Sequence, residues 1–165
     1  MAGPHIFQEG GGSNFLCLPY NPQYGEHITD APGLGFAYIY GAEYQHLYQF
    51  SYINNGGRSI FKNDAPCAAC YIHSRHTSIM IPTRRECPAG WTQEYQGYLV
   101  AESANSGQGR KRSSYTCLDG APEAVPGGQA TSNQASLYAV RSGCGALHCP
   151  NYIEGWELTC TVCTR

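Results

Sequence analysis

The sequence is short of charge, of strong helix formers and of long apolar runs. The formal net charge of its 165 residues at pH 7 is -2, so charge indicates neither a nucleic acid nor an acidic membrane surface as a partner. No run approaches the about 18 consecutive apolar residues that span a bilayer, and we expect no membrane insertion. The basic run at 110–112 lies in a Ser/Gly-rich stretch and is interpreted as part of a solvated loop.

Signals of processing and of common catalytic machinery are also missing. Residues 2–14 are polar and glycine-rich and show no signal peptide, so we expect the chain to be a mature form. No Asn-x-Ser/Thr sequon occurs, and glycosylation therefore gives no indication of the compartment. The chain contains neither Gly-x-Ser-x-Gly nor a phosphate-binding Gly-Lys-Ser/Thr loop.

The residue types that are abundant predict a mostly β protein. The chain has 13 tyrosines, 20 glycines and 10 prolines, but only two methionines. Tyr, Thr, Ile and Val favour strands, whereas Gly, Pro, Asn and Asp favour turns. Alternating patterns predict strands over 76–81 and 95–101, and Asn54-Asn55-Gly56-Gly57 predicts a hairpin turn. The polar segments 103–114 and 122–133 are predicted to be loops, and little helix is expected.

Nine cysteines in so short a chain are typical of secreted, extracellular proteins built on disulfides. Two C-x-x-C motifs stand out, Cys67-Ala-Ala-Cys70 and Cys160-Thr-Val-Cys163. A structural zinc site is one interpretation, but its paired motifs are usually about 15–20 residues apart, far closer than here. A redox motif is another, but that chemistry needs a thiolate at a helix N-terminus, and no helix start follows either motif.

An internal duplication explains the cysteine pattern better. Three segments of the first part recur in order in the second: Phe15–Leu18 resembles Tyr115–Leu118, Phe36–Gly41 resembles Ser136–Arg141, and the two C-x-x-C motifs correspond. Each half thus contains Cys-Leu, an alternating apolar strand and C-x-x-C. We therefore expect two similar disulfide-linked β subdomains, residues 1–82 and 83–165. The first lacks a counterpart of Cys87, which accounts for the odd cysteine total.

Several strings resemble a known family. Cys67-Ala-Ala-Cys70, His76-Thr-Ser-Ile-Met-Ile-Pro82 and Cys87-Pro-Ala-Gly-Trp91, followed by Gly97-Tyr98, are similar to the centre of the C-terminal non-collagenous domain of type IV collagen. Three further strings resemble its invertebrate relatives, the spongin-type short-chain collagens: Gly11-Gly-Ser-Asn-Phe-Leu-Cys-Leu-Pro19, Tyr38-Ile-Tyr-Gly-Ala-Glu-Tyr44 and Trp156-Glu-Leu-Thr-Cys-Thr-Val-Cys163. The resemblance covers the chain from about residue 10 to its end and implies a fold like that of the collagen domain.

The resemblance also implies a disulfide pairing. It would join Cys87 to Cys163, Cys117 to Cys160, and Cys144 to Cys149 in the second half. In the first half Cys17 would pair with Cys67, which leaves Cys70 unpaired. Closing a loop of about 80 residues, as a link from Cys87 to Cys163 would do, restricts the unfolded chain and contributes a few kcal/mol.

The sequence departs from the family in two ways. It contains no Gly-X-Y repeat, so this chain alone cannot form a collagen triple helix. The lysine that type IV collagen uses for an intersubunit crosslink has no equivalent around Gly155-Trp156-Glu157. We therefore expect a homo-oligomer rather than a covalent hexamer of the collagen kind.

Aromatic and titratable residues give weaker indications, and no ligand-binding residue can be assigned. We interpret five tyrosines as core residues, and both tryptophans as packed on disulfides: Tyr38, Tyr40, Tyr48, Tyr98, Tyr138, Trp91 and Trp156. His73-x-x-His76 could offer metal ligands, completed by Glu43, Glu94 or Asp119, but residues three apart on a strand point to opposite faces. A dyad of Cys70 with a histidine would need an orienting group that the sequence does not indicate.

Two functions follow from these observations, neither of them catalytic and neither requiring a cofactor or metal. The first is a secreted module for extracellular matrix assembly, which associates with itself and docks to other matrix proteins or glycans. The second is a soluble lectin, because exposed tyrosines and Asn/Gly-rich loops suit sugar binding and duplicated halves would supply avidity.

Overall fold

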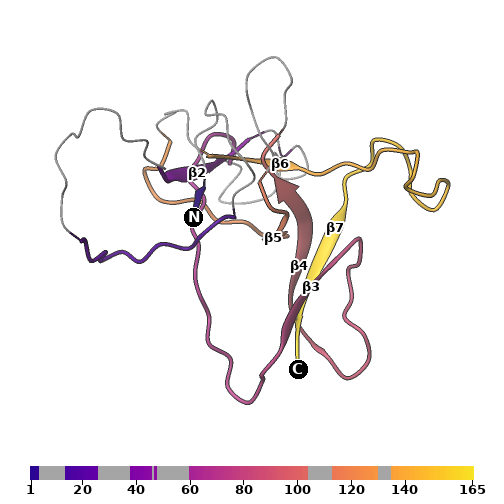
Figure 1. Cartoon of the computed structure of the whole chain (residues 1–165), viewed down its shortest axis with the longest axis horizontal. Helices are drawn as coiled ribbons and strands as arrows, with labels where there is room; N and C mark the ends of the chain where they lie inside the picture. The colour runs from indigo at the N-terminus through magenta and orange to yellow at the C-terminus, as the bar shows by residue number, and fades with distance from the viewer. Residues whose placement is uncertain (4–13, 26–37, 46, 48–59, 104–112, 130–134) are drawn as a thin grey trace.

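A computed structural model of the chain describes residues 1–3, 14–25, 38–45, 47, 60–103, 113–129 and 135–165 (Figure 1). These residues form seven strands and no helix: β1 Ala2–Gly3, β2 Tyr40–Tyr44, β3 Ser78–Pro82, β4 Thr92–Ala101, β5 Thr116–Asp119, β6 Ala135–Ala139 and β7 Thr159–Thr164. The predicted mostly β class is thus confirmed. No helix long and apolar enough to cross a membrane occurs among these residues.

The strands form one mixed sheet with β4 at its centre. Their order is β1-β2-β6-β4-β7-β3, and β5 pairs with β4 in addition. Only β2 and β6 pair in parallel, while the other pairings between these strands are antiparallel. In Figure 1, β4 runs down the middle with β7 and β3 beside its lower part, and β2 and β6 lie across the top.

Both strands predicted from alternation are present, but neither begins at the predicted residue. The strand expected over 76–81 is β3, which begins at Ser78, and the one expected over 95–101 is β4, which begins at Thr92. Of the strand inferred over 36–41 from the repeat, residues 36 and 37 lie outside the described residues, 38 and 39 are not strand, and 40 and 41 begin β2, which spans Tyr40–Tyr44. Its buried part, Ala42–Tyr44, is the part that pairs with β6.

Several sequence expectations lie partly or wholly outside the described residues. These are the turn at 54–57, the side chains of Tyr48 and of the basic run 110–112, and most of the loop 103–114. Of the predicted loop 122–133, residues 122–129 are described and contain no strand.

Alternation along β4 divides the buried apolar residues into two clusters. Val100 packs into one cluster with Tyr44 and Leu137. Its neighbour Leu99 packs into the other with Cys117 and Cys160. Successive side chains of a strand point to opposite faces, so one run of β4 supplies both cores. The second core is built around a disulfide.

The disulfide between Cys117 and Cys160 forces β5 over the face of β4. Cys117 pairs across from Leu99 on one side of β4, and Cys160 pairs across from Gly97 on the other. In a flat sheet, strands on either side of a third lie about 9.5 Å apart. The two cysteine Cα atoms are only 5.7 Å apart, so β5 must bend towards β7 across β4.

Gly97 is the residue that permits this crossing. A Cβ atom at Gly97 would lie 1.9 Å from the carbonyl oxygen of Leu118 and 2.8 Å from the carbonyl carbon of Asp119. Both are backbone atoms, so no side-chain rotation could relieve the overlap. The missing side chain, rather than an unusual backbone angle, is what the position requires.

The two predicted subdomains share this sheet. Cys17–Cys67 lies within residues 1–82, and the other three disulfides lie within residues 83–165. Strand pairing crosses that boundary twice, however, because β2 pairs with β6 and β3 pairs with β7. The division into 1–82 and 83–165 stays a prediction from the repeat.

We expect Gly97→Ala to destabilise the protein by at least about 3 kcal/mol, because overpacking against backbone cannot relax by side-chain movement. Gly143→Ala is a matched control, since nothing lies within 4 Å of a Cβ atom there. Urea unfolding followed by circular dichroism measures both. Equal midpoints for the two variants would contradict the proposed crossing.

Candidate functional site

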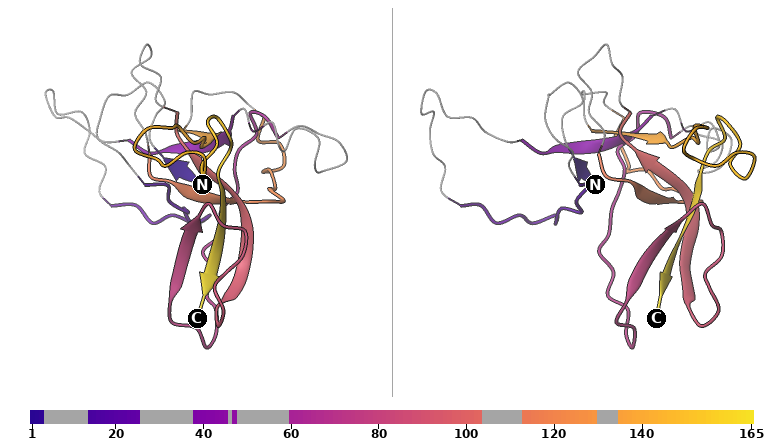
Figure 2. Two further views of the ribbon diagram at one scale, coloured as in Figure 1. Left: turned by 90° about the vertical axis from the view of Figure 1, so that its right-hand side faces the viewer. Right: turned by 45° about the vertical axis from the view of Figure 1, so that its right-hand side comes forward.

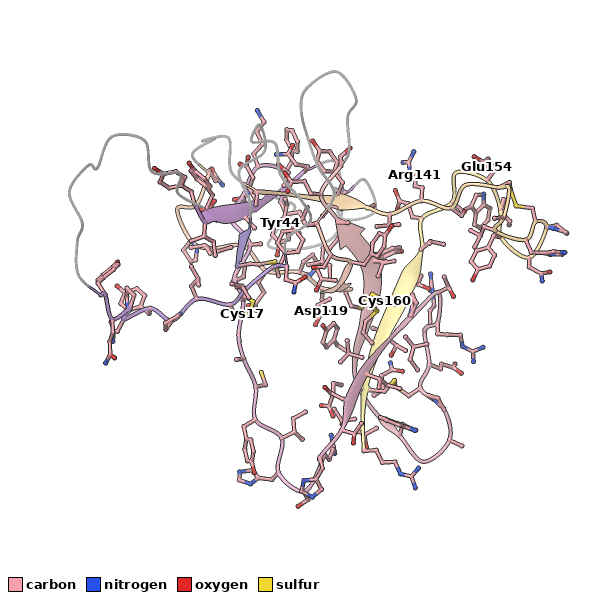
Figure 3. All side chains as sticks on the ribbon, in the orientation of Figure 1. Cys17, Tyr44, Asp119, Arg141, Glu154 and Cys160 are labelled. Carbon is pink, nitrogen blue, oxygen red and sulfur yellow. A yellow bond between two sulfur atoms is a disulfide. The ribbon has the colours of Figure 1, made fainter. Side chains whose placement is uncertain are left out.

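Four disulfides frame the surfaces on which a site could be built. They join Cys17 to Cys67, Cys87 to Cys163, Cys117 to Cys160, and Cys144 to Cys149, with Cα separations of 5.3, 5.9, 5.7 and 6.0 Å. These are the pairs that the collagen resemblance implies. Cys70 is free and exposed. Figure 3 labels Cys17 and Cys160, one from each half of the chain.

The C-x-x-C motif of β7 links two other segments of the chain. Cys160 and Cys163 are three residues apart on a strand, and alternation directs such side chains to opposite faces. Cys160 therefore reaches β5, and Cys163 reaches Cys87 in the segment between β3 and β4. The C-x-x-C spacing, which could also suit two zinc ligands, thus allows β7 to form disulfides with two different segments of the chain.

The residues considered as metal ligands do not form one cluster, and several of them make other contacts. No three His, Cys, Asp or Glu side chains in the described ranges are grouped so as to hold a metal ion. The ring of His73 packs edge-on against Tyr71, with centroids 5.0 Å apart. Asp119 accepts a hydrogen bond from the backbone N–H of Ala121 at 2.8 Å. Glu43 is buried on β2 and accepts a hydrogen bond from the amide of Gln45.

Glu94 has a structural role. The register between β4 and β7 shifts between Gln93 and Tyr95, which places Glu94 in a β-bulge, and a bulge re-aims the side chain that it carries. The Glu94 carboxylate contacts the guanidinium of Arg75 and the hydroxyl of Thr164. Arg75 also donates to the Thr164 hydroxyl at 3.0 Å. This network fastens the segment before β3 to β4 and β7.

The tyrosines that are buried are not all those predicted from the sequence. Tyr38 was expected in the core, yet its exposed fraction is 59%. Tyr40 and Tyr138 are half-buried, and Tyr98 packs against the first cluster. Among the residues that the structure describes, the largest fully buried side chain is instead Tyr44, at 2% exposure. Its place at the end of an apolar-alternating run is the signal that could have identified it.

Burial changes the chemistry of two tyrosines. Tyr44 donates a hydrogen bond from its hydroxyl to the carbonyl oxygen of Glu123 at 2.8 Å. Burial, assisted by the negative charges of Glu123 and Asp119, raises the pKa of Tyr44 to about 12. Burial and Asp119 also raise the pKa of Tyr95, whose hydroxyl donates to the carbonyl of Cys117 at 3.2 Å. Both hydroxyls thus hold elements together in the neutral form.

One edge of the sheet combines open backbone with exposed apolar side chains. β3 is the last strand of the sheet and pairs only with β7 among the described strands. Ile79 and Met80 are 36% and 37% exposed, on opposite faces of the strand. Figure 2 shows β3, β7 and the lower part of β4 projecting together below the rest of the molecule.

The expected packing of both tryptophans on disulfides is wrong for Trp156. Its exposed fraction is 66%, whereas Trp91 is partly buried. Trp156 lies beside an open cavity of about 430 Å³ at the base of the loop that carries Cys144–Cys149. A second, smaller cavity of about 210 Å³ is bordered by Tyr115 and Tyr138. Cys160, four residues after Trp156, had suggested that the indole is buried against a disulfide, and nothing in the local sequence indicated that it is exposed.

No protein-family model matches the chain, and no solved structure matches it.

We expect Tyr44→Phe to lower the free energy of unfolding by about 1 kcal/mol at neutral pH, because a hydrogen bond to Glu123 is lost. In the parent protein, the pKa of Tyr44 is higher in the folded state than in the unfolded chain, so the neutral hydroxyl favours folding. This contribution is fully present below pH 10 and is lost as the pH rises from 10 towards 12. The loss is about 1.4 kcal/mol per pH unit.

Urea unfolding between pH 8 and 12 tests this prediction. Both proteins should carry Cys70→Ser, because a free thiolate exchanges with disulfides at high pH. The pH-dependent loss should be smaller in Tyr44→Phe than in the parent. Parallel stability curves for the two proteins would show that Tyr44 ionises in the folded state as readily as in the unfolded chain.

Proposed function

We propose that this chain is a non-catalytic, secreted module for extracellular matrix assembly, which associates with copies of itself through the outer edge of β3. The observation that carries the proposal is the combination of an open strand edge with exposed apolar side chains. Natural proteins usually protect such edges, because unpaired backbone groups recruit another strand. An edge left open in a stable disulfide-linked domain is a suitable surface for self-association.

The hydrogen-bond pattern identifies which groups of β3 are available. Thr77 and Arg165 exchange both backbone hydrogen bonds, at 3.0 and 3.1 Å. Antiparallel pairing alternates, so Ile79 and Ile81 also bond towards β7. The N–H and C=O groups of Ser78 and Met80 therefore face outwards. Pro82, which has no N–H, occupies the third outward position.

We include in this proposal that the chain is related to the non-collagenous domain of the collagens and that its two halves arose by duplication. Supporting them are the agreement of all four disulfides with the implied pairs and the recurrence of Cys-Leu and C-x-x-C in order. Four disulfides in a chain of this size are typical of proteins that fold in an oxidising compartment, which supports an extracellular location. A domain of this class would contribute self-association and docking, with the matrix partner recognised through the assembled form.

We expect Met80→Pro to convert an oligomeric parent into a monomer. The substitution removes an outward N–H without removing a hydrogen bond to β7, as Pro82 already does two residues later. Light scattering coupled to size exclusion measures the mass. Met80→Lys is a second variant that keeps the N–H and adds a charge to the edge, and it should also be monomeric.

Met80→Leu is the matched control, because it conserves volume and backbone and should leave the mass unchanged. Circular dichroism confirms that each variant is folded. A parent that is monomeric at every concentration tested, or an oligomer that persists in both Met80→Pro and Met80→Lys, would refute assembly through β3.

Cys70 offers a covalent link between the associated copies. It is exposed, and it lies in the segment that precedes β3. We expect mild oxidation to join two chains through their Cys70 sulfurs, giving a dimer band in non-reducing electrophoresis that disappears on reduction. Cys70→Ser should lack this band and keep the non-covalent mass. A parent that yields only monomer bands after oxidation would contradict the link.

A further inference from the structure

We propose that the cavity beside Trp156 binds an acidic saccharide, whose ring stacks on the indole and whose carboxylate or sulfate pairs with Arg84. This site is separate from the β3 edge and goes beyond the self-association proposed above. It gives a location and a ligand class to the second function expected from the sequence, the lectin. Three features support the site: the rigid backbone that holds Trp156, the residues that border the cavity, and the positive charge of Arg84.

The backbone around Trp156 is fixed on both sides. The N–H of Ser142 donates to the carbonyl of Trp156 at 2.9 Å, and the N–H of Gly155 donates to the carbonyl of Ser142 at 2.9 Å. Gly155 has a φ of 76°, a conformation that glycine adopts without strain. The resulting turn presents the indole outwards from an ordered ladder, so its exposure is not that of a loose loop.

The loop beyond this ladder is also closed. Cys144 and Cys149 are joined, and the carboxylate of Glu154 accepts a hydrogen bond from the N–H of Cys144. At its base, Arg141 pairs with Glu157 Oε1 at 3.3 Å. Figure 3 shows Arg141 where this loop leaves the sheet and Glu154 further out along it. A site built here would need little reorganisation on binding, which favours affinity.

The residues bordering the cavity suit a sugar better than an apolar partner. Ile153 and Leu158 border it beside Trp156, and the other bordering residues are polar, among them Arg84, Asn151, Tyr152 and Glu157. A flat aromatic surface surrounded by amide, carboxylate and guanidinium groups can stack on a sugar ring while bonding its hydroxyls. The cavity volume of about 430 Å³ lies within the range of about 300–1,000 Å³ for small-ligand sites.

Arg84 decides the charge of the ligand. Of the charged groups at the cavity, Glu157 is already paired with Arg141. Arg84 follows β3 closely, where the N–H of Thr83 bonds to Thr159 at 2.7 Å. Within the described residues its guanidinium makes no ion pair, so one positive charge is available to a ligand. Arginine binds carboxylates and sulfates through two parallel hydrogen bonds.

The second cavity is a weaker candidate for the same ligand. Its volume of about 210 Å³ falls below that range, and its tyrosines, Tyr115 and Tyr138, are not presented by a disulfide-closed loop. Arg141 borders it, but its guanidinium is already paired with Glu157. We therefore assign the ligand to the Trp156 cavity.

The test is a glycan-array screen of the full chain with neutral, uronic-acid and sulfated oligosaccharides, followed by titration of the free oligosaccharides that bind. We expect binding to acidic sugars, with the uronic-acid and sulfated arms showing which acidic group is preferred. Trp156→Ala should weaken binding at least tenfold, as expected for a central aromatic contact. Arg84→Gln should remove the preference for acidic over neutral sugars and most of the salt dependence.

Tyr71→Ala is the matched control, because Tyr71 is 83% exposed and lies away from the cavity, and it should bind as the parent does. In a Trp91→Phe background Trp156 is the sole tryptophan, and its emission should shift when sugar binds. The mass in solution should not change in Trp156→Ala, which separates this proposal from assembly through β3. No binding, binding to neutral sugars alone, or equal binding by Trp156→Ala would overturn it.

Discussion

The close crossing of β5 over β4 at Gly97 is the constraint on which the rest of the structure depends. A disulfide between strands on either side of β4 is compatible with its 5.7 Å Cα separation only if β5 leaves the plane of the sheet. That path lies against the backbone of β4 and requires a residue without a side chain. Once it is made, the disulfide becomes the centre of the second core, packed by Leu99.

The crossing helps to fix the position of β7, and through β7 that of β3. β7 is held from one face by Cys160 and from the other by Cys163, so its position is fixed along most of its length. β3 is bound to β7 on one side, which leaves its other edge open. Arg84 lies two residues after the end of β3, and Trp156 lies three residues before the start of β7. Copies joined along β3 would therefore carry their Trp156 cavities close to the joined strands, and avidity would follow from the assembly.

Sequence patterns predicted the features that depend on neighbouring residues, and they did not predict the features that depend on residues distant in the chain. Alternating residues located β3 and β4, because a strand with two distinct faces reveals its period. Their first residues were predicted wrongly, because the bulge at Glu94 and the pairing with β7 decide where each strand begins. Tyr38 and Tyr44 occur in one short run, and tertiary contacts, among them the pairing of β2 with β6, determine which of them is buried.

The sequence by itself determined the β class and the dependence on cysteine, and the four cysteine pairs of the structure are those that the resemblance implies. Those properties depend on the types of residues and on their order along the chain, both of which can be seen in the sequence. The tertiary structure alone decided that the two halves share one sheet, that Gly97 must lack a side chain, and that Trp156 faces outwards. Each of these depends on which backbone comes within a few ångströms of another, and that proximity is created only when the chain folds.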